Sequence, residues 1–158
     1  MMTVDDMLFE ARAMLAIRVA PTEAYDEMER GALLVDIRYL EQRVRDGEIP
    51  RAVHIARNEF EWRCDPSSAW RHRMIRKGDY ERRIIVICNQ GYQSSFAAAN
   101  LVRMGLRNAT DVEGGMENWL QNGLPIRPFE HNKLRKLLHV TAAQIANPQS
   151  RPIHGRPR

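Results

Sequence analysis

The chain has 158 residues, of which 44% are hydrophobic and 28% charged, and its net charge at pH 7 is +4. This length suits one domain with a buried core and is short for two. No apolar run approaches the 18 or so residues that a membrane span needs, and the acidic N-terminus does not resemble a secretory signal. We therefore expect no membrane contact. Two cysteines, Cys64 and Cys88, are too few for a disulfide scaffold, so we expect a protein of the reducing cytoplasm.

Positive charge is concentrated at the C-terminal end, where residues 127–158 hold seven Lys or Arg side chains and one acid, Glu130. Such a tail can contact nucleic acid or an acidic surface. No aromatic stacking platform accompanies the charges, so we interpret them as a solvated tail rather than a nucleic-acid site. Residues 130–146 have helical apolar spacing, which predicts a helix that docks on its own domain or pairs two chains. Residues 147–158 are predicted to be disordered.

Helices and strands are predicted to alternate from the N-terminus onward. Thr3 and Asp6 form a capping-box pattern before apolar residues at helical spacing, which predicts a helical extension over residues 1–16. A short strand is expected at 17–19. The next helix is expected to follow a turn at Pro21, with Thr22 as its N-cap, and to end at Gly31.

Strands of a sheet are predicted at residues 32–37, 52–55, 83–87 and 109–112. The first and third are nearly continuous apolar runs, as in strands buried on both faces of a parallel sheet. Helices are predicted at 39–46, within 58–77 with Asp65 restarting one of them, at 94–104 and at 114–123. This alternation indicates an α/β fold with a mostly parallel central sheet and helices on both faces.

A cysteine stands directly after the third of these strands, in a short loop before an alanine-rich helix. In parallel sheets the functional crevice lies beyond the carboxyl ends of the strands, which is where Cys88 is placed. Gly91 permits a positive φ, so the loop amides can turn inward as an anion nest, and Ser94 can cap the helix. These features favour a Cys88 thiolate and could hold an extra sulfur as a persulfide anion. The alternative is a buried, inert cysteine. The loop residues are Cys88, Asn89, Gln90, Gly91, Tyr92, Gln93 and Ser94.

Three separated segments resemble the rhodanese-like sulfurtransferase family, in the order and spacing that its single-domain members show. The segments LVDIR at 34–38 and GEIPRA at 47–52 resemble the family's DxR and GHIPGA stretch. The loop CNQGYQS at 88–94 resembles C-x-x-G-x-[RT]-S, and VEGGMENW at 112–119 with GLP at 123–125 resembles the LxGGxxxW and GLP ending. The resemblance implies a rhodanese-like domain over about residues 17–126, followed by the basic helix and tail at 127–158.

The resemblance implies a sulfurtransferase in which Cys88 is the nucleophile. Its thiolate would take sulfane sulfur from thiosulfate, another small molecule or a protein persulfide, and would pass it to a thiol or cyanide acceptor. It implies no cofactor and no metal. The alternative function is a binding or regulatory module without catalysis, for which the neutral loop and the terminal segments would be suited.

The chain departs from the family pattern at several positions. The loop has no basic residue, since Asn89 and Gln93 stand where charge is common, so we expect weak thiosulfate activity. Arg57 and Arg63 are the candidates for supplying positive charge near the pocket, although a solvated helix face is an equal interpretation. Cys64 could resolve a Cys88 persulfide, but a surface cysteine without a role is the simpler interpretation.

Other motif residues are interpreted as structural. Asp36 and Arg38 are expected to form a salt bridge or a cap rather than to catalyse. Glu48 and Arg51 replace a histidine and a glycine of the family motif and are expected in a turn.

Phosphatase or arsenate reductase chemistry is the main enzymatic alternative for this loop. Those enzymes need an arginine at the sixth position after the cysteine to clamp a tetrahedral dianion. That position is Ser94 here, which disfavours the alternative.

Overall fold

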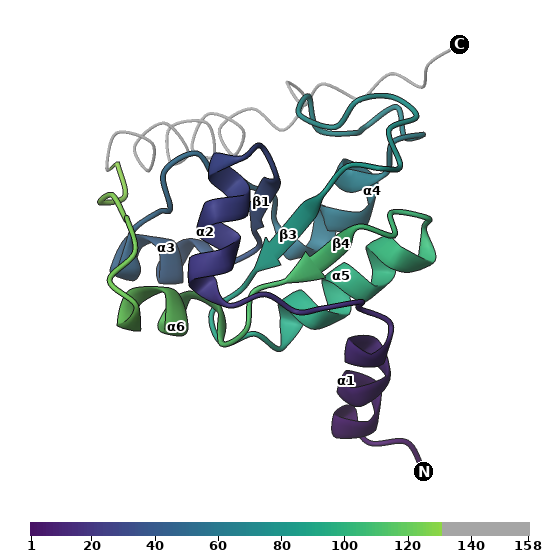
Figure 1. Ribbon diagram of the computed structural model, residues 1–158, viewed down its shortest axis with the longest axis horizontal. Helices are drawn as coiled ribbons and strands as arrows, with labels where there is room; N and C mark the ends of the chain where they lie inside the picture. Colours follow the sequence, from purple (N-terminus) through teal and green to yellow (C-terminus); the bar gives the residue numbers. More distant parts are fainter. Residues whose placement is uncertain (131–158) are drawn as a thin grey trace, which may run out of the picture.

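The computed structural model describes residues 1–130, and the predicted C-terminal helix and disordered tail lie outside them. Its centre is a parallel four-stranded sheet in the order β2-β1-β3-β4 (Figure 1). The strands are β1 (Leu33–Asp36), β2 (Val53–His54), β3 (Ile84–Ile87) and β4 (Ala109–Asp111). The helices are α1 (Val4–Ala13), α2 (Pro21–Glu29), α3 (Leu40–Asp46), η1 (Arg57–Glu59), α4 (Phe60–Cys64), α5 (Gln93–Arg103) and α6 (Gly115–Gln121).

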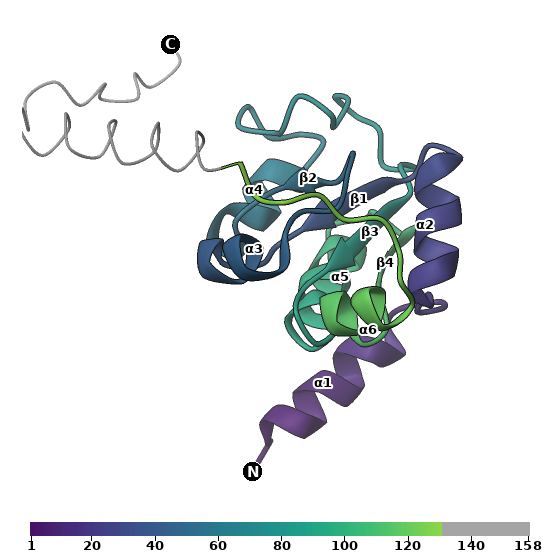
Figure 2. The same ribbon diagram turned by 90° about the vertical axis from the view of Figure 1, so that its left-hand side faces the viewer.

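Both faces of the sheet are covered by helices, as the near-continuous apolar runs predict. Every residue of β1 and β3 is buried. Because side chains alternate along a strand, Val35, Ile84 and Val86 belong to a core cluster with α4 and α5. Their neighbours Leu34 and Ile85 belong to the cluster with α2 and α6 (Figure 2). The predicted α/β class, with a parallel sheet between two helical layers, is confirmed.

Two local predictions at the N-terminal side need correction. Thr22 is not the cap of α2, because the helix begins at Pro21 and the Glu23 carboxylate accepts a 2.9 Å hydrogen bond from the Ala20 amide. The expected strand at 17–19 is reduced to a single parallel bridge between Val19 and Val112. In contrast, the Thr3–Asp6 capping box is present at the start of α1.

The segment after α4 also differs from its prediction. Asp65 does not restart a helix, because its carboxylate accepts hydrogen bonds from the Ser67 amide (2.7 Å) and hydroxyl (2.8 Å) and so closes a tight turn. No helix or strand follows until β3; Ile75 is buried in the core and Tyr80 packs against it. The helix that was expected to restart at Asp65 is replaced by this turn.

The two ends of the described chain pack on the domain in different ways. Helix α1 projects beside α5 (Figures 1 and 2). At the other end, Arg127 pairs with Glu48 in an antiparallel bridge, and Phe129 is buried. Among residues 1–130, no helix has the length and apolar character that would be needed to cross a membrane.

Candidate active site

Cys88 lies immediately beyond β3, at the carboxyl end of the sheet. Its side chain is 7% exposed. The Gly91 amide donates to its sulfur at 3.1 Å, and the Ser94 hydroxyl oxygen lies 3.2 Å from it. The thiol is therefore held from two sides by polar groups of its own loop while it keeps a small opening to solvent.

The first two loop carbonyls are turned away from the loop interior by α6. The amides of Met116 and Glu117 donate to the carbonyls of Cys88 (2.8 Å) and Asn89 (3.0 Å). This contact requires glycine at position 115, where an added Cβ would lie 2.5 Å from the Cys88 carbonyl oxygen. Since the C=O and N–H of a trans peptide point in opposite directions, the amides that follow these carbonyls are turned to the other side.

The remaining loop amides are available to a ligand. Gly91 adopts a φ of +80°, as expected for the turn. The amides of Gln90, Tyr92, Gln93 and Ser94 have no hydrogen-bond acceptor within residues 1–130. Together with the Gly91 amide on the sulfur, this arrangement has the donor groups that an anion nest requires.

Ser94 does not cap the helix, which is a correction to the sequence interpretation. Helix α5 begins one residue earlier, at Gln93, and its first turn has no side-chain cap. The Ser94 hydroxyl instead donates to the Asp111 carboxylate at 2.8 Å, deep below the loop. Ser94 is fully buried and contacts the sulfur from the interior.

A pocket of about 190 Å³ opens beside the thiol. The loop contributes Cys88 and its neighbours, and the segment that follows β1 forms the opposite wall. Its lining mixes apolar and aromatic side chains with amides and two arginines, which suits a small molecule with both a polar and an apolar part. The lining residues are Ile37, Arg38, Tyr39, Gln42, Arg57, Cys88, Asn89, Gln90, Tyr92 and Gln93.

Of the two predicted arginines, Arg57 reaches this pocket and Arg63 does not. Arg57 donates to Glu61 at 2.9 and 3.1 Å, but its buried Nε has no partner within residues 1–130. Arg63 instead donates to the Trp70 carbonyl at 3.0 Å and lines a separate hollow with Trp62. The expectation that Arg63 supplies charge to the site is therefore wrong, because the turn after α4 draws it away.

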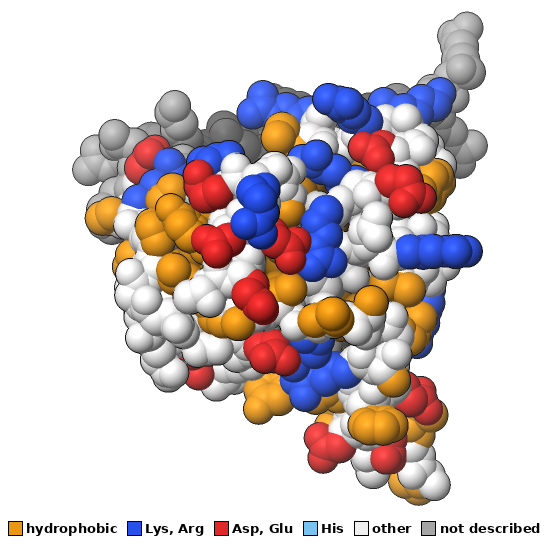
Figure 3. All heavy atoms as spheres, viewed as in Figure 1, with side chains coloured by type: hydrophobic (Ala, Val, Ile, Leu, Met, Phe, Trp, Pro, Cys, Tyr) orange, Lys and Arg blue, Asp and Glu red, His pale blue; other side chains and the backbone are white. Residues whose placement is uncertain are grey.

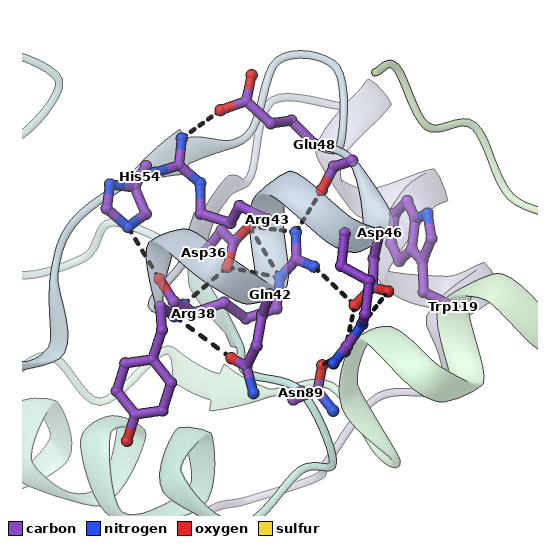
Figure 4. A network of polar contacts seen from close by, with 12 residues as sticks. Asp36, Arg38, Gln42, Arg43, Asp46, Glu48, His54, Asn89 and Trp119 are labelled. Carbon is purple, nitrogen blue, oxygen red and sulfur yellow. Dashed lines mark hydrogen bonds and ion pairs between the residues drawn. The ribbon is translucent and has the colours of Figure 1, made fainter. Parts of the chain in front are cut away.

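The Asp36–Arg38 pair is a buried structural ion pair, as predicted. Arg38 binds both Asp36 oxygens and the Gly47 carbonyl, the last at 2.8 Å, and its free edge faces Asp46 at 3.7 Å (Figure 4). Through Arg45, this network extends to the Asn89 side chain at 3.5 Å (Figure 4). It fixes the wall of the pocket that faces the cysteine loop.

Cys64 is not a surface cysteine. Its side chain is fully buried in the α4 and α5 core, and burial, with a smaller effect of Glu61, raises the pKa of its thiol to about 12. Almost none of it is thiolate at neutral pH, so it is poorly suited to resolve a persulfide.

Comparison with known families shows which family this chain belongs to. The model of the rhodanese-like domain matches residues 20–122. The chain belongs to the rhodanese-like family. It is 33% identical over 102 residues to thiosulfate sulfurtransferase GlpE of Pseudomonas savastanoi pv. phaseolicola, a match that covers 65% of this chain and 85% of that protein. For GlpE of Haemophilus influenzae (strain Rd), identity is 30% over 108 residues, covering 68% and 91%.

Solved structures place this rhodanese-like chain in the same fold. A Rhodopseudomonas palustris protein of unknown function, described as a possible tyrosine phosphatase, superposes with a TM-score of 0.70 at 28% identity, covering 80% of this chain and 95% of that one. The polysulfide-sulfur transferase homodimer of Wolinella succinogenes superposes with a TM-score of 0.62 at 23% identity, covering 79% and 87%.

Three charged residues behind the rhodanese-like loop escaped the sequence interpretation. Asp111 is fully buried at the end of β4, where Arg18 binds it at 2.7 and 3.1 Å and the hydroxyls of Ser94 and Ser95 each donate at 2.8 Å. Arg12 of α1 donates to the Gly91 carbonyl at 2.9 Å. The available signal was the acid at position 111 of a predicted strand, since a buried charge needs a partner.

Proposed function

We propose that this chain is a rhodanese-type sulfurtransferase that carries sulfane sulfur as a persulfide on Cys88. The observation that carries the proposal is the Gly91 amide on the Cys88 sulfur, among loop amides that have no acceptor within the described chain. Relatives of 30% identity or more that are named thiosulfate sulfurtransferases support it. The reaction needs a reduced Cys88, which agrees with the cytoplasmic location expected from the cysteine content.

The transfer proceeds in two displacements at sulfur. The Cys88 thiolate attacks the outer sulfur of the donor, so an S–S bond to Cys88 forms while the donor's own bond to that sulfur breaks. The electron pair of the broken bond leaves with the donor fragment, which is sulfite when the donor is thiosulfate. An acceptor thiolate or cyanide then attacks the outer sulfur of the persulfide, and Cys88 leaves again as thiolate. Loop amides directed at the terminal sulfur stabilise its charge in both steps.

The pocket favours a donor that is larger and less charged than thiosulfate. The loop residues Asn89 and Gln93 are neutral. The two arginines of the lining are already paired with acids, Arg38 with Asp36 and Arg57 with Glu61. Tyr39 and Tyr92 add aromatic surface. We therefore expect an organic persulfide of low molecular weight, or a protein persulfide, to load Cys88 faster than thiosulfate does.

The test is intact-protein mass spectrometry after incubation with thiosulfate and with glutathione persulfide. Wild type should gain the mass of one sulfur atom, and Cys88→Ala should gain none. The matched control is Cys64→Ala, which removes the buried thiol and should leave the gain in place. Sulfur loading that survives in Cys88→Ala would contradict the proposal.

The remaining outcomes of the same test identify the alternatives. Absence of a mass gain with every donor would favour a binding module without catalysis. Hydrolysis of an aryl phosphate that disappears in Cys88→Ser would favour the phosphatase activity named for the Rhodopseudomonas palustris protein. The structure disfavours that outcome, because Ser94, at the sixth position after the cysteine, is buried against Asp111.

A further inference from the structure

The Gly91 carbonyl is held by two arginines that come from behind the cysteine loop. Arg12 donates to it at 2.9 Å and Arg18 at 3.2 Å. The Ser95 hydroxyl oxygen lies 3.1 Å from the same carbonyl, but its single proton is directed at the closer Asp111 carboxylate. Arg12 lies on α1, and Arg18 lies in the segment between α1 and α2. Residues more than 70 positions away in the sequence therefore bind the middle of the loop.

This contact fixes the orientation of the next amide. In a planar trans peptide, the Gly91 carbonyl and the Tyr92 N–H point in opposite directions. With the carbonyl drawn to the arginines, the Tyr92 N–H faces the other side of the loop, toward the pocket that Cys88 and Tyr92 both line. Arg12 also stacks over the Tyr92 ring at 5.7 Å, which holds the same residue from its side chain.

Arg18 has a second effect, on charge. The Asp111 carboxylate is fully buried and shares Ser94 with the Cys88 sulfur, so its negative charge acts against a thiolate or persulfide anion. Arg18 binds both carboxylate oxygens and offsets that charge. Burial alone would lower the pKa of Arg18, but Asp111, together with the charges of Glu113 and Cys88, raises it, so the guanidinium stays charged.

We propose that Arg12 and Arg18 are positioning residues of the sulfur-transfer site. They lock the Gly91–Tyr92 peptide so that its N–H meets the anion on Cys88, and Arg18 also cancels the charge of Asp111. The proposal rests on Cys88 as the sulfur carrier. It makes the N-terminal helical segment part of the site's support.

The experiment compares Arg12→Gln and Arg18→Gln with the matched control Arg103→Gln. Arg103 is exposed at the end of α5, and its guanidinium donates to Asn100 of the same helix. Two quantities are measured in the full chain: the rate of single-turnover sulfur loading from glutathione persulfide, and the pH midpoint of Cys88 alkylation by iodoacetamide, followed by mass spectrometry. A merely structural role would lower thermal stability without moving the alkylation midpoint.

The expected results differ between the two arginines. Arg18→Gln should slow loading about tenfold or more and raise the alkylation midpoint by about one pH unit, because it loses both the carbonyl contact and the charge compensation. Arg12→Gln should slow loading about threefold or more with a smaller shift of the midpoint, because it leaves Asp111 paired. Loading rates and midpoints equal to those of Arg103→Gln would overturn the proposal.

Two further variants keep the test decisive. If Arg18→Gln does not fold, Arg18→Lys replaces it. Because lysine keeps the positive charge, the pH midpoint of Cys88 alkylation should stay near that of wild type. Because lysine lacks the planar guanidinium with its several hydrogen bonds, sulfur loading should still slow about threefold. Unchanged loading in Arg18→Lys would then overturn the proposal. Cys88→Ser tests the proposed function separately from the role of the arginines. Sulfur loading in that variant would refute Cys88 as the carrier, whatever the arginine variants show.

Discussion

Gln93 is the residue whose identity should tune the choice of sulfur donor. It is the first residue of α5, it is exposed, and it lines the pocket beside Cys88. We predict that Gln93→Arg lowers the KM for thiosulfate by roughly tenfold, about 1.4 kcal/mol, because a guanidinium there can bind the donor's oxygens through charge-assisted hydrogen bonds. Steady-state kinetics with thiosulfate and cyanide measure this change.

The control for Gln93→Arg adds the same charge elsewhere. Gln121 is exposed at the end of α6 and does not line the pocket, so Gln121→Arg should leave the KM unchanged. Equal effects of the two variants, or a loss of activity in Gln93→Arg, would show that local charge does not limit thiosulfate use.

Arg51 stands in a backbone conformation that favours glycine. Its φ is +69°, and it occupies the position of the second glycine in the family's GHIPGA motif. The left-handed conformation costs a side-chain-bearing residue about 1–2 kcal/mol. We therefore predict that Arg51→Gly is more stable than Arg51→Ala by about 1 kcal/mol, measured by urea unfolding.

Comparing glycine with alanine at this position removes the salt bridge from consideration. Both variants lose the exposed ion pair of Arg51 with Glu29 (2.8 Å), so their difference reports the backbone alone. The control position is Glu41, in the first turn of α3. There Glu41→Ala should be more stable to urea than Glu41→Gly, as is usual in a helix. If alanine were also the more stable at position 51, the strain argument would fail.

At the scale of elements, helix α2 is tied to the start of β3 by an ion pair. Arg83 donates to both oxygens of Glu27, at 2.6 and 3.0 Å, and to the Asn108 carbonyl before β4. The hydrogen bond and charge of Arg83 outweigh partial burial and lower the pKa of Glu27. The pair therefore contributes stability above the unfolded-state pKa of about 4.3, and that contribution is lost as the pH falls through the lower, folded pKa.

This linkage gives a pH-dependent prediction for Glu27→Gln. The variant should be less stable than wild type by about 0.5–1 kcal/mol at pH 7, because the pair is only partly buried. The difference should shrink as the pH is lowered below about 4, where the wild-type carboxylate becomes protonated. Urea unfolding at a series of pH values measures it, and a difference that is constant down to pH 3 would contradict the assignment.

Elements with a dense apolar pattern were predictable from the sequence, and elements governed by turn chemistry were not. The runs around β1 and β3 are buried on both faces, so composition alone marks them. Residues 58–77 are rich in Arg, Trp and Glu and were expected to hold short helices, but Asp65 closes a turn onto Ser67 and the helix does not resume. A side chain that bonds its own backbone competes with the helix in a way that periodicity cannot reveal.

At the scale of the molecule, α1 is the least covered element. Its side chains Val4, Met7 and Phe9 are 66%, 48% and 76% exposed, and Figure 3 shows hydrophobic and acidic side chains over this projecting helix. The expectation that terminal helices pair two chains stays a prediction. We expect sedimentation to show a dimer at micromolar concentration, and Phe9→Glu to shift it toward monomer, because the variant places a charge in the apolar contact.

A matched exposed aromatic provides the control for the dimer. Trp62 on α4 is 61% exposed, and Trp62→Glu should leave the sedimentation coefficient unchanged. A monomeric wild type, or equal loss of dimer in both variants, would remove α1 as the pairing surface.

The cysteine loop could be located from the sequence, but its support could not. Cys88, Gly91 and the neutral loop are contiguous, so strand, glycine and helix signals appear together in one short segment. Arg12 and Arg18 come from the N-terminal segment and Asp111 comes from β4, and the three residues meet through the parallel sheet and the packing of α1 on α5. In the sequence these three charged residues cannot be told apart from ordinary surface residues; their contacts with the loop appear only in the folded structure.

The position of Arg12 and Arg18 bears on where the domain is taken to begin. The family match starts at residue 20, two positions after Arg18. A fragment cut at that boundary would keep Cys88, its loop and the three segments that resemble the family motifs. It would lack Arg12, which binds the Gly91 carbonyl, and Arg18, whose guanidinium neutralises Asp111, so the Asp111 carboxylate would remain unpaired near the Cys88 sulfur. The proposed roles of Arg12 and Arg18 therefore extend the catalytic unit beyond the N-terminal end of the family match, which lies at residue 20.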